Sequence, residues 1–384
     1  MKRMMMLVWI GAMLVALTGC TPLEERAASR SAASPSPSPT PSESSMIQKA
    51  GSSLATAIRD AGAALDEVVD SLESFDNLDL NLGNDLSELA SIEWDKLSGH
   101  SFDRGITTSA IDSKIQEVRI TNRNGRILLK RGEVSEVQAA LTVVVDHVTK
   151  EEAKTVADKA QVEINRKGKT LEIHTTAPSY GKRGQYEPSL LLTVTLPEKT
   201  KAALAVEQAN GVVDARNAAG TESLSVTVRN GSIEVREALG ALVLEMENGR
   251  LEVNDAKEAV TAKVTNGEIT ARGIKGPLVM KAVNGRLSAK DVFSSVEAEV
   301  AAGVVTLESE TLGGDWSATS EVGTVSLSWP ANASVAVEGE VSIGGVKTDF
   351  PLTVSKGKAT GTIGKGTYKV KAKAFAGLRL EQVR

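Results

Sequence analysis

The chain has few of the residues from which active sites and bulky cores are built. Its 384 residues include one cysteine, three histidines and 3% aromatic residues. A single cysteine excludes an intrachain disulfide, and the scarcity of aromatic rings means that a core must rest on Val, Leu, Ile and Ala. Such a core favours narrow, regular β-layers. The net charge of −5 gives no argument for nucleic-acid binding.

Catalytic and metal-binding patterns are missing as well. No spacing of cysteine with His100, His147 or His174 indicates zinc, and we expect His147 and His174, at strand positions among apolar neighbours, to be structural. No Gly-x-Ser-x-Gly elbow or phosphate-binding loop is present. The sequence therefore predicts no catalytic residue, no cofactor and no metal site.

The first residues have the form of a bacterial lipoprotein leader. Lys2 and Arg3 precede an apolar stretch, residues 4–17, which is too short to span a bilayer. Leu17-Thr18-Gly19-Cys20 then resembles a lipobox. We expect a signal peptide over 1–19 and thioether lipidation of Cys20, since two or three acyl chains anchor a protein stably. This predicts an extracytoplasmic protein on the bacterial cell membrane.

Two segments separate the anchor from the repeats. Residues 20–45 are rich in Ser and Pro and predict a disordered tether. Residues 46–114 predict an acidic, partly helical stalk, with no Lys or Arg between Asp60 and Asp95. Within it we expect a helix, with three interpretations: it packs on its own β-domain, it forms the stalk, or it docks a partner. Helical spacing is carried by Ile58, Ala61, Leu65, Val68, Val69 and Leu72.

The C-terminal part, residues 115–384, is built on Asn-Gly pairs at steps of 20, 18, 18 and 18 residues. Short alternating apolar runs flank each pair, and a fixed period is typical of a stacked repeat array. Weaker echoes follow at Ala302-Gly303, Val322-Gly323 and Gly344-Gly345, and Asn124-Gly125 is an outlying earlier copy. The five pairs are Asn210-Gly211, Asn230-Gly231, Asn248-Gly249, Asn266-Gly267 and Asn284-Gly285.

Two geometries fit one repeat. Asn-Gly between alternating flanks is a strong hairpin pattern, which would give a meander. The constant step favours a mainly β fold in the form of a β-solenoid, with Asn-Gly at one corner and segments such as Ala238-Leu-Gly240 at the other. Stacked asparagines would then form a ladder, and eight coils would extend roughly 40 Å. Ahead of the array we expect a strand at 137–148, a helix at 151–160 and a hairpin around Lys167-Gly168.

The chain resembles the DUF4097 family of candidate adhesins over residues 115–384. The resemblance rests on the Asn-Gly repeats, on Leu192-Thr-Val-Thr-Leu-Pro197 before them, and on Gly364-Lys-Gly366, Tyr368-Lys-Val370 and Gly377-Leu-Arg-Leu380 after them. It implies β-strand repeats on bacterial surface proteins with envelope-associated roles, and it supplies no catalytic residues.

Charge is segregated near the C-terminus. Between Asp291 and Val346 there are nine acidic residues and no basic ones, whereas 356–384 is strongly basic. Alternation places Lys369, Lys371 and Lys373 on one strand face. We interpret them as a basic cap over the open end of the solenoid or as a site for anionic wall polymer or lipid. The acidic side chains, which are a solvated face or a surface for a cationic peptide, include Glu297, Glu299, Glu308 and Glu310.

The sequence thus predicts a non-enzymatic module for surface binding, adhesion or envelope sensing. Its expected partners are the membrane through Cys20 and a cell-wall polymer, a cationic peptide or another envelope protein. The alternative is an enzyme acting on cell-wall glycan, which would need two carboxylates opposed across a cleft.

Overall fold

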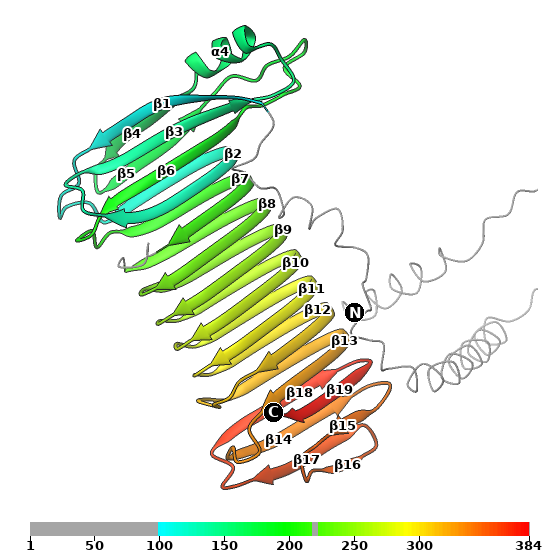
Figure 1. Cartoon of the computed structure of the whole chain (residues 1–384). Helices are drawn as coiled ribbons and strands as arrows, with labels where there is room; N and C mark the ends of the chain where they lie inside the picture. Colours follow the sequence, from blue (N-terminus) through cyan, green and yellow to red (C-terminus); the bar gives the residue numbers. More distant parts are fainter. Residues whose placement is uncertain (1–98, 217–221, 384) are drawn as a thin grey trace, which may run out of the picture. The chain divides into compact units, whose positions relative to one another are not determined.

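The computed structural model describes residues 99–216 and 222–383, which form a mainly β structure (Figure 1). The predicted signal peptide, Cys20, the tether and most of segment 46–114 lie outside the described residues. Within the described ranges, no helix is long and apolar enough to cross a membrane. The elements are β1 (His100–Ser109), β2 (Glu117–Gly132), β3 (Val137–Val145), α4 (Lys150–Asp158), β4 (Gln161–Lys167), β5 (Thr170–Thr176), β6 (Ser189–Pro197), β7 (Ala203–Arg216), β8 (Ser223–Ala238), β9 (Ala241–Ala256), β10 (Val260–Ile274), β11 (Leu278–Val292), β12 (Val296–Glu308), β13 (Trp316–Trp329), β14 (Val335–Val341), β15 (Val346–Thr348), β16 (Thr353–Ser355), β17 (Lys358–Ile363), β18 (Tyr368–Ala374) and β19 (Gly377–Gln382).

Strands β7 to β13 lie side by side in chain order, and each neighbouring pair is parallel (Figure 1). Val260, for example, pairs with Leu242 on one side and with Leu278 on the other, each 18 residues away in sequence. A two-residue turn can join antiparallel strands only. The Asn-Gly pairs are therefore not hairpin turns. Each lies inside one long strand, and the chain forms a solenoid-like stack of coils.

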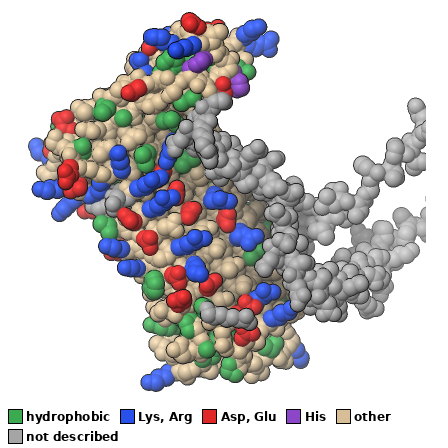
Figure 2. Space-filling model, in the orientation of Figure 1, with side chains coloured by type: hydrophobic (Ala, Val, Ile, Leu, Met, Phe, Trp, Pro, Cys, Tyr) green, Lys and Arg blue, Asp and Glu red, His purple; other side chains and the backbone are tan. Residues whose placement is uncertain are grey.

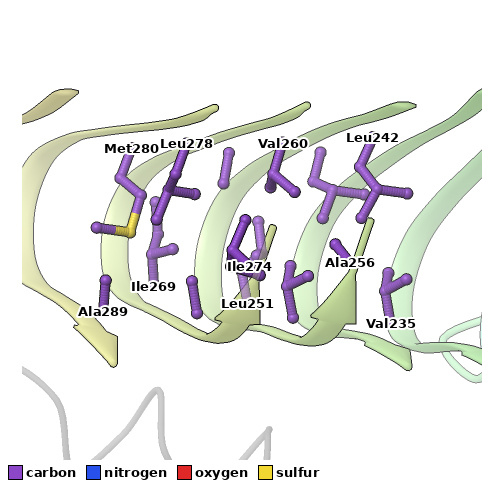
Figure 3. Packing of buried hydrophobic residues seen from close by; sticks show 14 of the residues in the cluster. Val235, Leu242, Leu251, Ala256, Val260, Ile269, Ile274, Leu278, Met280 and Ala289 are labelled. Atoms are coloured by element: carbon purple, nitrogen blue, oxygen red, sulfur yellow. The ribbon is translucent and has the colours of Figure 1, made fainter. Parts of the chain in front are cut away.

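Alternate side chains of each strand point into this stack and form its core. In β9, Leu242 and Leu244 are buried before the Asn-Gly pair and Leu251 after it. Because the side-chain period of a strand is two, the intervening residues face outward. Figure 3 shows Leu242, Val260 and Leu278 in a row from three successive coils, with Leu251 across the core from them. Small aliphatic side chains thus fill the narrow interior.

The glycines of the Asn-Gly corners occupy positions that exclude any side chain. The φ angles of Gly231, Gly249 and Gly267 are 138°, 135° and 145°, a region that glycine alone adopts readily. A Cβ atom on Gly249 would lie 1.9 Å from the carbonyl oxygen of Gly231 in the adjacent coil. Glycine is required both for its backbone conformation and for the close approach of successive coils.

The asparagines of these corners form a hydrogen-bonded ladder along the stack. Nδ2 of each Asn donates to Oδ1 of the Asn in the preceding coil, at 2.8 or 2.9 Å. Asn124 donates in turn to Oε2 of Glu187 at 3.2 Å, and Ala302 takes the place of Asn in the coil after Asn284. The ladder consists of Asn124, Asn210, Asn230, Asn248, Asn266 and Asn284.

At the opposite corner of four successive coils, one residue adopts a left-handed backbone conformation. Glu237, Asp255 and Asp291 have φ angles of 56°, 60° and 55°, and Gly273, at the equivalent place, has 66°. Aspartate is among the few side chains that favour this left-handed region. The predicted corner at Ala238-Leu-Gly240 begins one residue after the left-handed position.

The N-terminal end of the stack is closed by antiparallel strands and α4. The early Asn-Gly copy is the first coil, because β2 pairs with β7 in register and places Asn124 opposite Asn210. The predicted helix is α4, which begins with a capping box between Thr149 and Glu152, and the predicted hairpin is β4–β5. β1 pairs with β3, so the sheet begins inside segment 46–114, the expected stalk.

At the C-terminal end, spatial order departs from chain order. β18 and β19 pair with β13, while β14 and β15 pair with β18 and β19. The C-terminal segment is therefore inserted between β13 and β14, and Gly344 stacks on Ala376 instead of on Gly323. The prediction that the array continues in chain order to the echo at Gly344-Gly345 is wrong beyond β13. A repeat period identifies equivalent residues, but it does not specify which strand pairs with the last repeat.

Candidate binding groove

A groove crosses the coils beside the Asn-Gly corners. Its volume is about 1230 Å³, and it is lined by residues of β2 and of β7 to β13. Its two walls are columns of outward-facing side chains, one three positions before the corner Asn and the other directly before it. The first column is Thr121, Glu207, Thr227, Glu245, Lys263, Lys281, Glu299 and Thr319. The second is Arg123, Ala209, Arg229, Glu247, Thr265, Val283, Ala301 and Glu321.

The groove follows from an interruption in the backbone pairing. Between β9 and β10, Met246 pairs with Val264 and pairing resumes only at Asn248, which leaves Glu247 out of the register. Met246 is buried, so the side chains on either side of it point outward. The same interruption recurs in the neighbouring coils. The two outward columns are therefore separated by a continuous trough.

Ion pairs between neighbouring coils balance the charge of the groove. Lys263 Nζ lies 3.0 Å from Oε1 of Glu245. Lys281 Nζ lies 2.8 Å from Glu297 and 2.8 Å from Glu299. Two hydrogen bonds raise the pKa of Lys281: the one to Glu297 has the larger effect, and the one to Glu299 the smaller. Figure 2 shows basic and acidic side chains interspersed on the visible face of the stack. The groove therefore has no strong charge of one sign.

Comparison with known proteins supplies a family for this architecture. Residues 106–377 match the model of the family described as Toastrack DUF4097. The chain belongs to this family. The resemblance inferred from the Asn-Gly repeats is thereby confirmed. Among curated proteins, no sequence matches the chain.

Solved structures with similarity to this chain include two proteins described as candidates for adhesion. A candidate cell adhesion protein from Clostridium sporogenes is 13% identical, with 74% of this chain and 100% of that chain covered and a TM-score of 0.22. A candidate adhesin from Bacteroides fragilis is 12% identical, with 73% and 98% covered and a TM-score of 0.31.

In this Toastrack domain, the acidic run expected to receive a cationic peptide is largely paired within the fold. Glu297 and Glu299 both bind Lys281, and Glu308 lies 3.0 Å from Lys290 of the preceding coil. A hydrogen bond to Glu308 raises the pKa of Lys290. The preceding coils thus supply the lysines that the run itself lacks in sequence. Of the four predicted residues, Glu310 alone forms no ion pair among the described residues.

The predicted lysine strand is β18, and it does not cap the stack. β13 lies on one side of it and β14 on the other, with β17 and β16 beyond. Lys371 lies 3.8 Å from Glu338 of β14, and the backbone N–H of Lys369 donates to Asp315 at 2.8 Å. Lys373 is exposed and forms no ion pair within the described residues. The three side chains share one face, but only Lys373 is close to the Asn-Gly corner.

One buried carboxylate, that of Asp214, was not predicted from the sequence. The side chain of Asp214 in β7 is 1% exposed and lies 2.7 Å from both Arg126 and Arg216. Burial would raise the pKa of Asp214, but hydrogen bonds from Arg216 and Arg126 outweigh it and lower the pKa. Arg126 belongs to β2, 88 positions away in sequence, so spacing alone does not reveal the cluster. It joins the first two coils.

The two histidines expected to be structural strand residues differ from each other. His174 lies in β5, 3.4 Å from Glu163. His147 follows β3 in a left-handed conformation with a φ of 61°, is exposed and stacks on Tyr186 with ring centroids 5.1 Å apart. The expectation of a strand position is therefore wrong for His147. No group of three metal-ligating side chains occurs in the described part of the chain.

Proposed function

We propose that this protein is a lipid-anchored, extracytoplasmic binding module whose groove holds an extended polymer of the cell envelope without chemical turnover. The groove carries the proposal, because it continues over eight coils with the same two-column lining. A ligand that lies along it would meet polar groups at each coil step of roughly 4.8 Å. Adhesion at the cell surface is the more general function of which this polymer binding is a specific case.

The lining supports binding to a polymer more than it supports catalysis. Glu245 and Glu299 are each engaged by a lysine of a neighbouring coil. On the opposite wall, Glu247 lies 3.7 Å from Arg229 of the preceding coil and is likewise paired, whereas a glycosidase needs two carboxylates that act on opposite sides of the scissile bond. The adjoining Asn ladder adds a row of amides along the same corner. Many weak, repeated contacts would hold a long chain better than a small molecule.

The groove is tested by filling it. Ala301→Trp places a bulky ring on the second column, and we expect it to abolish retention on isolated cell walls. Ser288→Trp is the matched control, because Ser288 faces outward on the other half of the neighbouring coil. Equal retention of both variants would refute the groove. Release of wall fragments by the wild-type protein would instead favour an enzyme acting on wall glycan.

The anchor is tested separately. The lipobox predicts that Cys20→Ser prevents acylation and moves the protein out of the membrane fraction. Mass spectrometry of the processed chain would measure the acyl chains directly. Retention of the unacylated variant in the membrane fraction would refute the anchor, without bearing on the groove.

A further inference from the structure

The corner that carries the Asn ladder changes character at the C-terminal end of the stack. After Asn284 the corner positions are Ala302 and Val322. The backbone N–H of Ala376 then donates to Gly323 at 2.8 Å, and that of Ile343 donates to Phe375 at 2.7 Å. These bonds place Val322, Phe375 and Ile343 next to one another on three adjacent coils. They are 47%, 38% and 43% exposed.

Other exposed large apolar side chains of the stack, such as Val243, Val283 and Phe293, lie at different positions along their coils, whereas these three occupy the same corner of adjacent coils. Core positions of the same coils are filled with Val, Leu, Ala and Trp, so these three side chains are not needed to complete the interior. An exposed apolar group rimmed by polar residues marks a surface for another molecule. We call Val322, Phe375 and Ile343 the corner strip.

Lysines without ion-pair partners surround the corner strip. Lys373, on the outer face of β18, lies two residues before Phe375. Lys347, in β15, lies four residues after Ile343. Lys356 lies in the turn before Gly357, whose carbonyl accepts from Val341 at 2.8 Å. All three are exposed and form no ion pair among the described residues, whereas Lys358 and Lys371 nearby are paired with glutamates.

We propose that the corner strip and these three lysines dock onto an anionic lipid surface. Apolar side chains that enter the headgroup region and lysines that meet lipid phosphates are the two contributions by which peripheral proteins bind bilayers. The strip supplies the first and Lys347, Lys356 and Lys373 supply the second. Glu321 of the groove wall directly precedes Val322. The inference concerns a contact additional to the proposed lipid anchor, and it does not require that anchor.

A fluorophore beside the strip tests the contact in the full-length, processed protein. Cys20 is the only native cysteine, and thioether formation would block its sulfur, so one introduced thiol can be labelled. We place a polarity-sensitive probe at Ala376→Cys, next to Phe375, and at Ser294→Cys, next to the exposed Phe293 of the opposite corner. Both proteins are reconstituted in vesicles of phosphatidylcholine with or without phosphatidylglycerol.

We expect the probe at position 376, but not at 294, to shift to shorter wavelength and to be quenched by brominated lipid in the phosphatidylglycerol vesicles. Each lysine should contribute about fivefold to binding, so the combined Lys347→Gln, Lys356→Gln and Lys373→Gln variant should bind about 100-fold more weakly. Added salt should weaken the wild type similarly.

Three results would overturn the proposal. One is identical behaviour of the two probes in the vesicles. Another is a shift at position 376 without vesicles, which would mean that a second copy or another part of the chain covers the strip. The third is a shift that is equal in both lipids and insensitive to the lysine changes. If Cys20 proves unacylated, the thiol at position 20 is replaced by Ser and the same probes are read after addition to preformed vesicles, so failure of the anchor is distinguished from failure of this surface.

Discussion

Replacing a corner glycine should damage the stack more than its chemical size suggests. In Gly249→Ala, the added Cβ would lie 1.9 Å from the Gly231 carbonyl oxygen, less than two-thirds of an ordinary contact distance. The oxygen belongs to the backbone and the place of a Cβ atom is set by the backbone of its own residue, so no side-chain rotation relieves the overlap. The φ of 135° adds conformational strain of about 1–3 kcal/mol, and overpacking adds about 1–3 kcal/mol. We expect a total loss of about 2–6 kcal/mol.

Gly273 in β10, the coil that follows that of Gly249, provides the matched control. Its φ of 66° is also positive, but Glu237, Asp255 and Asp291 adopt nearly the same angle at equivalent positions. A Cβ atom there would meet Oδ1 of Asp255 at 2.5 Å, and that carboxylate lies at the end of a movable side chain. We therefore expect Gly273→Asn to change the free energy of unfolding by less than about 1 kcal/mol.

Hydrogen exchange of the native protein, combined with thermal unfolding, measures both effects. Coils couple mainly to their neighbours, so Gly249→Ala should increase exchange in β8 to β10 and leave β2 and β13 protected. The inference that the two glycines have different roles would be refuted by equal stability of Gly249→Ala and the wild type, or by equal losses in the two variants. Uniform loss of protection across all coils would refute local coupling.

Three further outcomes are expected. Asn248→Ala removes two rungs of the ladder and should cost about 1–3 kcal/mol in chemical unfolding; no loss would show that the ladder contributes nothing to stability. Because the pKa of Asp214 is lowered in the folded state, its stabilisation is complete above the unfolded value near 3.9 and is lost as pH falls through the folded value. Asp214→Asn should therefore unfold at a lower temperature at pH 7 but lose less stability than the wild type below about pH 4; parallel acid titrations of the two proteins would contradict this. Lys290→Gln should change stability by less than about 1 kcal/mol, since its pair with Glu308 is exposed; a larger loss in the melting midpoint would show that the inter-coil pairs hold the stack together.

Much of the coil could be predicted because its determinants are local and repeated. The step of 18 residues between Asn248 and Asn266 is the offset at which the strands pair. The glycine after each Asn marks the place where the chain needs a positive φ, and the alternation around it shows which side chains are buried. Even the early copy at Asn124-Gly125 enters the stack as its first coil, although 86 residues separate it from Asn210.

The groove and the surface ion pairs were not found from the sequence, because they depend on which side chains meet across neighbouring strands and not on the pattern within one strand. The acidic run from Asp291 to Val346 looked unpaired until its neighbours in space, Lys281 and Lys290, were known. Asp214 looked like an ordinary outward residue, yet two arginines cover it, one of them from β2. The repeat step of 18 residues relates Lys281 to Glu299 and Lys290 to Glu308, but no repeat step relates Asp214 to Arg126, which lies 88 positions away.

The sequence by itself determined the unit of this domain: the coil length, the glycine corner, the Asn ladder and the buried apolar positions. All of these are set by contacts between a residue and its own copy one repeat away. Only the tertiary structure decided how the stack ends. There the chain reverses, β18 and β19 insert beside β13, and Phe375 comes to lie between Val322 and Ile343. A period cannot specify an arrangement that occurs once, because the strands that compete for the last open edge differ in pairing energy and not in pattern.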